Sequence, residues 1–189
     1  MTGPKWAALG LAGAVLSGCE GLDSAGGGGA FDIDQYFEGT ASWTFRDDGD
    51  TGDVDDSQVL RGQLDEDGTM EVRRGTRYAE GEKVGSFRWD LTAADLVLSA
   101  WSWGSEGSDT ATFFARGGAH SGDSVGNLQG DCVAESVADV STHYGTFDHA
   151  LASTCVDTPA PSGTWWFAPG FGLVRLESDI VTLDLVAPY

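Results

Sequence analysis

The sequence has 189 residues, 41% of them hydrophobic, and its 30 acidic and 10 basic side chains give a formal net charge of −20. Such an acidic chain repels nucleic acid and anionic lipid headgroups, which excludes a function in binding nucleic acid. The length suits one domain with a substantial core, and the 28 glycines point to many turns.

The chain begins with a segment typical of a secretory signal, residues 1–18. Lys5 supplies a positive charge, and Trp6 to Leu16 is almost wholly apolar or glycine. The segment runs into Leu16-Ser17-Gly18-Cys19, which resembles the lipobox of bacterial lipoproteins. The resemblance implies cleavage before Cys19, lipidation of its thiol and a stable membrane anchor. The alternative is an ordinary cleaved signal that happens to precede a cysteine.

This resemblance also implies where the protein resides. We expect a bacterial cell-envelope lipoprotein that carries palmitate or a similar acyl group on Cys19 and is held in the outer membrane of a Gram-negative bacterium. Its expected partner is the membrane, through the lipid anchor.

A flexible tether is predicted over residues 19–30, because Ala25 and Ala30 enclose four consecutive glycines. About eleven residues of such a chain have a root-mean-square reach of roughly 18 Å. One β-rich domain is expected over residues 31–189.

From Phe31 onward, apolar residues alternate with a period of two, which favours strands over helices. The turn sequence Asp65-Glu66-Asp67-Gly68 between two such runs predicts a hairpin. Strands are expected at residues 41–45, 59–64, 69–73, 84–89, 96–103, 111–115, 132–140, 146–156, 164–168, 173–177 and 180–186. The predicted fold class is therefore all-β, an antiparallel meander that forms an open or half-closed barrel.

The stretch Gly163 to Glu177, GTWWFAPGFGLVRLE, predicts a corner that joins two antiparallel strands. Pro169 cannot donate a ladder hydrogen bond, and Gly170 and Gly172 can adopt positive φ. Trp165 and Trp166 are adjacent in a strand and must face opposite sides of the sheet, so they cannot form one stacking platform.

Cys132 and Cys155 are predicted to form a disulfide, because disulfides persist outside the cytoplasm. A hairpin with Gly145 at its tip, centred between His143 and Tyr144, places the two cysteines directly opposite each other. Their Cα atoms would then lie about 4.5 or 5.5 Å apart, within bridging range. The same register pairs Val133 with Thr154, Val137 with Ala150 and Val140 with Phe147.

The segment from Asp47 to Asp56 holds six carboxylates in ten residues, the oxygen ligands that Ca²⁺ prefers. The spacing does not fit the EF-hand pattern. A looser calcium loop is one interpretation, and a solvated acidic loop is the other. Its candidate ligands are Asp48, Asp50, Asp53 and Asp55. No other cofactor is expected.

Several tryptophans could line a cavity for an apolar or sugar ligand inside a half-barrel. The candidates are Trp43, Trp89, Trp101 and Trp103. The alternative, which we favour, is that they pack in the core.

Two further resemblances are visible. Tyr36-Phe37, Ser42 to Phe45, Gly122-Asp123-Ser124, His143 to Asp148 and Thr164 to Arg175 resemble landmarks of a group of uncharacterised bacterial envelope lipoproteins. The stretch from Phe31 to Gly39, with Tyr36 in it and Trp43 after it, resembles the opening of bacterial lipocalins, although its Tyr36–Gly39 and Gly39–Trp43 spacings are longer. Both resemblances imply a β-rich lipoprotein, and the first implies no reaction.

No catalytic residue is predicted, and we expect that the chain is not an enzyme. The stretch from Gly122 to Gly126 fits the G-x-S-x-G pattern of serine hydrolases, but that motif needs a strand before it and a helix after it. We expect a structural or interaction role in the envelope. The alternative is a binder of a small apolar or sugar ligand in a half-barrel or lipocalin-like cavity.

Overall fold

A computed structural model of the chain describes residues 36, 42–47, 59–75, 77–90, 95–117, 124–125 and 132–188. All the strands in this part belong to one sheet, and a single short 3₁₀ helix, η2 (Tyr78–Glu80), interrupts them. The strands are β1 (Ser42–Asp47), β2 (Val59–Leu64), β3 (Thr69–Arg74), β4 (Glu82–Asp90), β5 (Asp95–Trp103), β6 (Glu106–Arg116), β7 (Ser124–Val125), β8 (Cys132–Ser141), β9 (Thr146–Cys155), β10 (Gly163–Ala168), β11 (Gly172–Ser178) and β12 (Thr182–Pro188).

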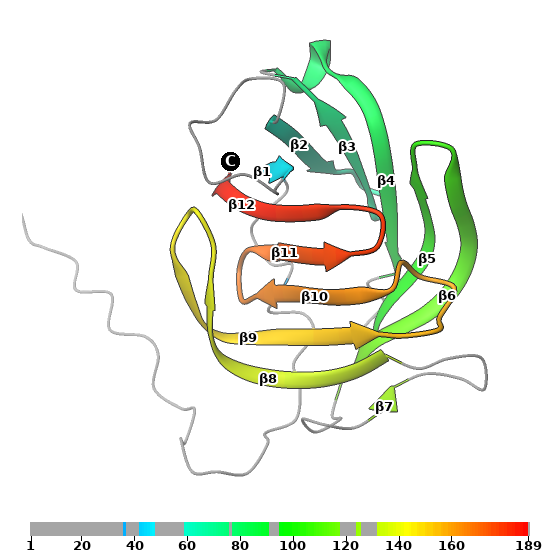
Figure 1. The fold of residues 1–189 in the computed structure, drawn as a ribbon, viewed down its shortest axis with the longest axis vertical. Coiled ribbons are helices and arrows are strands. Elements are labelled where there is room, and N and C mark those ends of the chain that lie inside the picture. The colour runs from blue at the N-terminus through cyan, green and yellow to red at the C-terminus, as the bar shows by residue number, and fades with distance from the viewer. Residues whose placement is uncertain are drawn as a thin grey trace, which may run out of the picture.

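The strands pair in the order β6-β5-β4-β3-β2-β1-β12-β11-β10-β9-β8-β7, and every pairing is antiparallel. All neighbours are consecutive in the chain except β1 and β12. In Figure 1, β8 to β12 form a curved wall, and β2 to β6 continue the sheet around its upper and right sides. The predicted antiparallel meander, curled into an open half-barrel, is confirmed.

The two ends of the sheet approach each other, and no hydrogen-bonded ladder joins them among the residues that the structure describes. The strand β6 packs against β8 and β9, and the Ser153 hydroxyl on β9 donates to the Phe114 carbonyl on β6 at 2.7 Å. Ser153 is fully buried, so this bond satisfies a polar group that would otherwise be costly inside the core.

An aromatic cluster fills the inner face of the curled sheet. Trp165 is fully buried, and its ring meets Phe87, Trp89 and Phe114 edge-on at centroid distances of 5.2, 5.7 and 5.0 Å. Phe167 meets Trp89 edge-on at 5.5 Å. Such contacts add to the stabilisation from apolar burial. The cluster draws on β4, β6 and β10, so it holds the two halves of the sheet together.

The corner between β10 and β11 has the predicted geometry. Gly170 and Gly172 have φ values of 74° and 67°, and the Phe171 amide donates to the Ala168 carbonyl at 3.0 Å. Trp165 faces the core, whereas Trp166 lies half-buried on the outer face beneath Arg175. The stretch GTWWFAPGFGLVRLE is therefore a corner with one tryptophan on each side of the sheet.

The β8–β9 hairpin has the predicted register. Cys132 lies opposite Cys155, with 4.2 Å between the Cα atoms, and the two form a disulfide. The register continues across β8 and β9 even though His149 adopts a φ of 59° within the strand. The three further predicted pairs are confirmed: Val133 with Thr154, Val137 with Ala150 and Val140 with Phe147.

We predict that Gly170→Val and Gly172→Val each lower the free energy of unfolding by about 1–3 kcal/mol, because a β-branched residue is strained at positive φ. Urea unfolding monitored by tryptophan fluorescence measures this. Gly170→Asn is the matched control and should cost less, because asparagine tolerates the left-handed region. Equal midpoints for wild type and both valine variants would contradict the prediction.

Replacing both Cys132 and Cys155 with alanine should destabilise the protein by about 3 kcal/mol, because the disulfide closes a long loop in the unfolded chain. The same urea assay measures the loss. Wild-type protein treated with a reductant before unfolding should give a similar loss. A double variant as stable as the wild type would show that the bridge does not stabilise the fold.

Candidate functional site

A cavity of about 590 Å³ opens on the outer face of the sheet, where the β2–β3 turn meets β4, β5 and β6. Its walls are rich in carboxylates, and Arg88 is the one basic side chain among the described residues that line it. The lining residues are Asp65, Glu66, Asp67, Gly68, Arg88, Trp89, Asp90, Ser99, Ala100 and Asp109.

Local hydrogen bonds build the turn that forms one wall of this cavity. The Asp65 carboxylate accepts from the amides of Asp67 and Thr69 at 3.3 and 2.9 Å, as is usual for aspartates in turns. Gly68 has a φ of 83° and accepts from the Trp89 amide at 2.8 Å. A Cβ at Gly68 would lie 2.3 Å from the Trp89 carbonyl oxygen, so only glycine lets the turn sit this close to β4.

The register of β4, β5 and β6 determines which residues form the other wall of this cavity. Arg88, Ala100 and Asp109 pair in one row across β4, β5 and β6, and the small Ala100 side chain forms part of the lining between the two charged residues. Hydrogen bonds from Thr69, and the contact with Asp65, lower the pKa of Asp67, which therefore stays ionised. The cavity thus favours a cationic group over an anion. Within the described ranges, no three acidic, histidine or cysteine side chains are placed to hold a metal ion.

The four tryptophans proposed as ligand-lining residues have different surroundings. Trp43 and Trp89 are almost fully buried, and the Trp43 indole nitrogen donates to the Phe171 carbonyl at the corner. Trp101 is half-buried and donates to the Pro159 carbonyl at 2.8 Å. The Trp103 ring stacks on the Phe87 ring with 6.0 Å between the ring centroids. Trp89 also borders the acidic cavity, which the other three do not line.

The remaining predicted site residues lie outside the described residues. These are the lipidation site Cys19, the tether and the candidate calcium ligands Asp48, Asp50, Asp53 and Asp55.

A polar cluster on the outer face joins β1, β12 and the tip of the β8–β9 hairpin. Asp184 lies in register between Arg46 on β1 and Arg175 on β11. Its carboxylate contacts the His143 ring at 3.0 Å, and the other ring nitrogen of His143 lies 3.2 Å from Arg46. The sequence did not indicate this cluster, because its members are up to 138 positions apart and belong to no motif.

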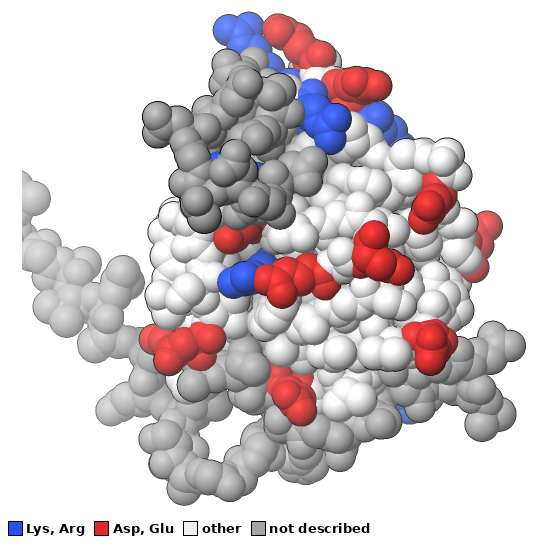
Figure 2. All heavy atoms as spheres, in the orientation of Figure 1, with Lys and Arg blue, Asp and Glu red and all other residues white. Residues whose placement is uncertain are grey.

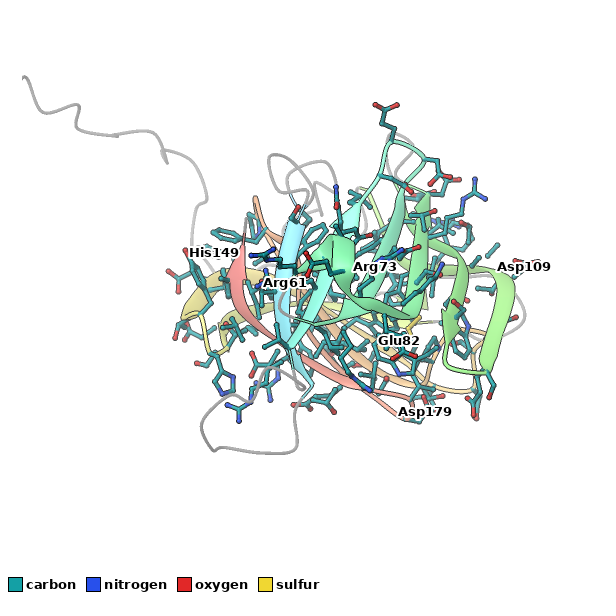
Figure 3. The ribbon with its side chains drawn as sticks, turned by 90° about the horizontal axis from the view of Figure 1, so that it is seen from above. Arg61, Arg73, Glu82, Asp109, His149 and Asp179 are labelled. Atoms are coloured by element: carbon teal, nitrogen blue, oxygen red, sulfur yellow. A yellow bond between two sulfur atoms is a disulfide. The ribbon has the colours of Figure 1, made fainter. Side chains whose placement is uncertain are left out.

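A second ionic cluster lies on the outer face of β3 and β4. Glu71 pairs with Arg73 at 2.6 Å and with Lys83 at 3.0 Å. Burial opposes ionisation of Glu71, but hydrogen bonds from Lys83 and Arg73 outweigh it and lower the pKa of the carboxyl group. Arg61 on β2 lies directly opposite Arg73 on β3. Figure 3 shows both residues projecting from this part of the sheet.

Figure 2 shows the side of the molecule that β9 to β12 form, with acidic side chains spread over it and few basic ones beside them. Figure 3 places Asp109, on the cavity wall, and His149, on the β8–β9 hairpin, at opposite ends of the molecule. The cavity and the β8–β9 hairpin are therefore separate features.

Comparison with protein-family models, with curated proteins and with solved structures finds no match to this chain. In the part of the chain that is described, no helix has the length and apolar character needed to cross a bilayer.

Glu71→Gln should lower the free energy of unfolding at pH 7 by less than about 1 kcal/mol, because the ion pairs are partly exposed. Because folding lowers the pKa of Glu71, its ionised form stabilises the fold fully above the carboxyl group's ordinary pKa of 4.5. This contribution to stability is lost as the pH falls through the pKa of Glu71 in the folded state. The difference between wild type and variant should therefore vanish in acid. Urea unfolding across this pH range measures it.

Glu80→Gln is the control for this prediction. Glu80 pairs with Arg77 at 3.2 Å, but its side chain is 70% exposed, so its loss should not be measurable. An equal loss of unfolding free energy in the two variants at pH 7 would show that the partial burial of the Glu71 ion pairs does not increase their contribution to stability.

Proposed function

We propose that this chain is a lipid-anchored β-domain of the bacterial cell envelope, with a structural or interaction role in the outer membrane. The observation that carries the proposal is how its three cysteines are used. Cys132 and Cys155 are fully buried and form a disulfide, which suits a compartment outside the cytoplasm. The third, Cys19, ends an apolar N-terminal run in a lipobox-like sequence, where acylation is the expected fate.

The packing of the interior supports an interaction role over the alternative, a small apolar or sugar ligand held inside the half-barrel. The interior between the two halves of the curled sheet is filled by aromatic rings in edge-to-face contact, those of Phe87, Trp89, Phe114, Trp165 and Phe167. Ligand sites are usually preformed clefts with a few convergent polar groups. The cavity described above lies on the outer face instead, and most of the residues that line it are charged.

The acidic composition also fits a domain held near a membrane. A formal charge of −20 repels anionic headgroups, so the folded part stays in solution at the end of its tether. Contacts with other envelope components would then be made by its outer faces.

Cys19→Ser should leave an unprocessed precursor that incorporates no labelled palmitate when the protein is expressed in a bacterial host. Fractionation followed by labelling and gel mobility measures this. The double variant Cys132→Ala/Cys155→Ala is the control, because it removes the other thiols and should keep the label. Equal labelling of wild type and Cys19→Ser would refute the anchor.

A further inference from the structure

The tip of the β8–β9 hairpin, Ser141 to Gly145, is fastened across β11 and β12 by hydrogen bonds. The His143 amide and ring Nδ1 contact the two carboxylate oxygens of Asp184 at 3.2 and 3.0 Å. The Tyr144 amide donates to the Leu185 carbonyl at 2.8 Å, and Arg175 donates to the Ser141 carbonyl at 3.0 Å. The tip is therefore held from both of its sides, and His143 makes two of the contacts.

The surroundings of His143 define its protonation state in this arrangement. Nη1 of Arg46 lies 3.2 Å from Nε2 of the ring. A guanidinium group can only donate hydrogen bonds, so Nε2 must accept and carry no proton. The proton is then on Nδ1, which donates to Asp184. The contacts hold together only with His143 as the neutral Nδ1–H tautomer.

Charged groups surround the docked tip on the neighbouring strands and on the hairpin itself. Asp184 pairs in register with two arginines, Arg46 on β1 and Arg175 on β11. Arg175 also pairs with Glu177. The hairpin itself carries Asp139, Asp148 and His149, which are exposed to solvent. A proton on Nε2 would place an N–H and a third positive charge against Arg46, while Asp184 would keep its bond to Nδ1.

Burial decides which side of this contact moves. Arg46 is 3% exposed within the sheet, whereas the His143 side chain is 35% exposed on a hairpin tip. Moving the arginine would disturb β1 and its partners. Moving the tip costs its few hydrogen bonds and the packing of the Tyr144 ring against Phe147 and Phe171.

We propose that the β8–β9 tip is an acid-sensitive latch, in which protonation of His143 at Nε2 breaks the contact with Arg46 and releases Ser141 to Gly145 from β11 and β12. Histidine is the side chain that changes charge between about pH 5 and pH 8. Release also uncovers an apolar surface, because the docked Tyr144 ring packs against the rings of Phe147 and Phe171. The centroid of the Tyr144 ring lies 6.0 Å from that of Phe147 and 5.9 Å from that of Phe171. The latch thus links acidification to the exposure of aromatic side chains.

Amide hydrogen exchange of the tip, corrected for the intrinsic effect of pH, tests this inference on the full chain. Between about pH 7.5 and about pH 5 the protection of the Tyr144 amide should fall at least about fivefold in the wild type. His143→Gln cannot take up the proton, so its protection should not change with pH. Unchanged protection in the wild type, or the same fall in His143→Gln, would overturn the proposal.

His149→Asn is the matched control, because it removes the other described histidine of the same hairpin at a position with φ of 59°, which asparagine tolerates. It should keep the wild-type response, and loss of that response would assign the effect to His149 instead. If His143→Gln fails to dock at neutral pH, ¹⁵N spectra of the wild-type imidazole decide. The Nδ1–H form at about pH 7.5 supports the latch, and the Nε2–H form overturns it.

Discussion

The pairing of β1 with β12 is the constraint on which the rest of the structure depends. Every other ladder joins strands that follow one another in the chain and closes only a short loop. The β1–β12 pairing joins Ser42–Asp47 to Thr182–Pro188 and merges two meanders, β1–β6 and β7–β12, into one curled sheet. Closing so long a loop carries a large entropic cost, which the buried aromatic cluster between the two halves offsets.

Polar contacts on the outer face of the sheet lie along the pairing of β1 with β12, which we call the seam. Arg46, Asp184 and Arg175 form one row across β1, β12 and β11, and the β8–β9 tip lies over that row through His143. On the inner side, Trp43 of β1 donates to the carbonyl of Phe171 at the corner. Hydrogen bonds therefore fasten both faces of the seam, and the hairpin tip is the exposed part of that arrangement.

The two ends of the β8–β9 hairpin are held by different chemistry. At its base a buried disulfide joins Cys132 to Cys155, and this bond does not respond to protons. At its tip the hold depends on the protonation state of one imidazole. In a domain held at an envelope membrane, as proposed above, this combination keeps the hairpin in register while its tip detaches.

The sequence by itself determined the local features of the fold. Period-two alternation located most of the strands, the positions of Cys132 and Cys155 gave the hairpin register, and the glycines of the corner predicted its backbone. These features depend only on residues close in the chain. The first half of β6, from Glu106 to Thr110, was missed because its glycine, serine and aspartate residues show no apolar alternation.

Only the tertiary structure decided which distant residues meet. Nothing local distinguishes β12 as the partner of β1, because an alternating strand can pair with any other strand of similar pattern. That pairing buries Asp184 between two arginines and brings it under His143, and the curl of the sheet sets Asp109 across from the β2–β3 turn. Polar residues on the outer face carry no periodic signal of their partners, since alternation records only which side faces the core.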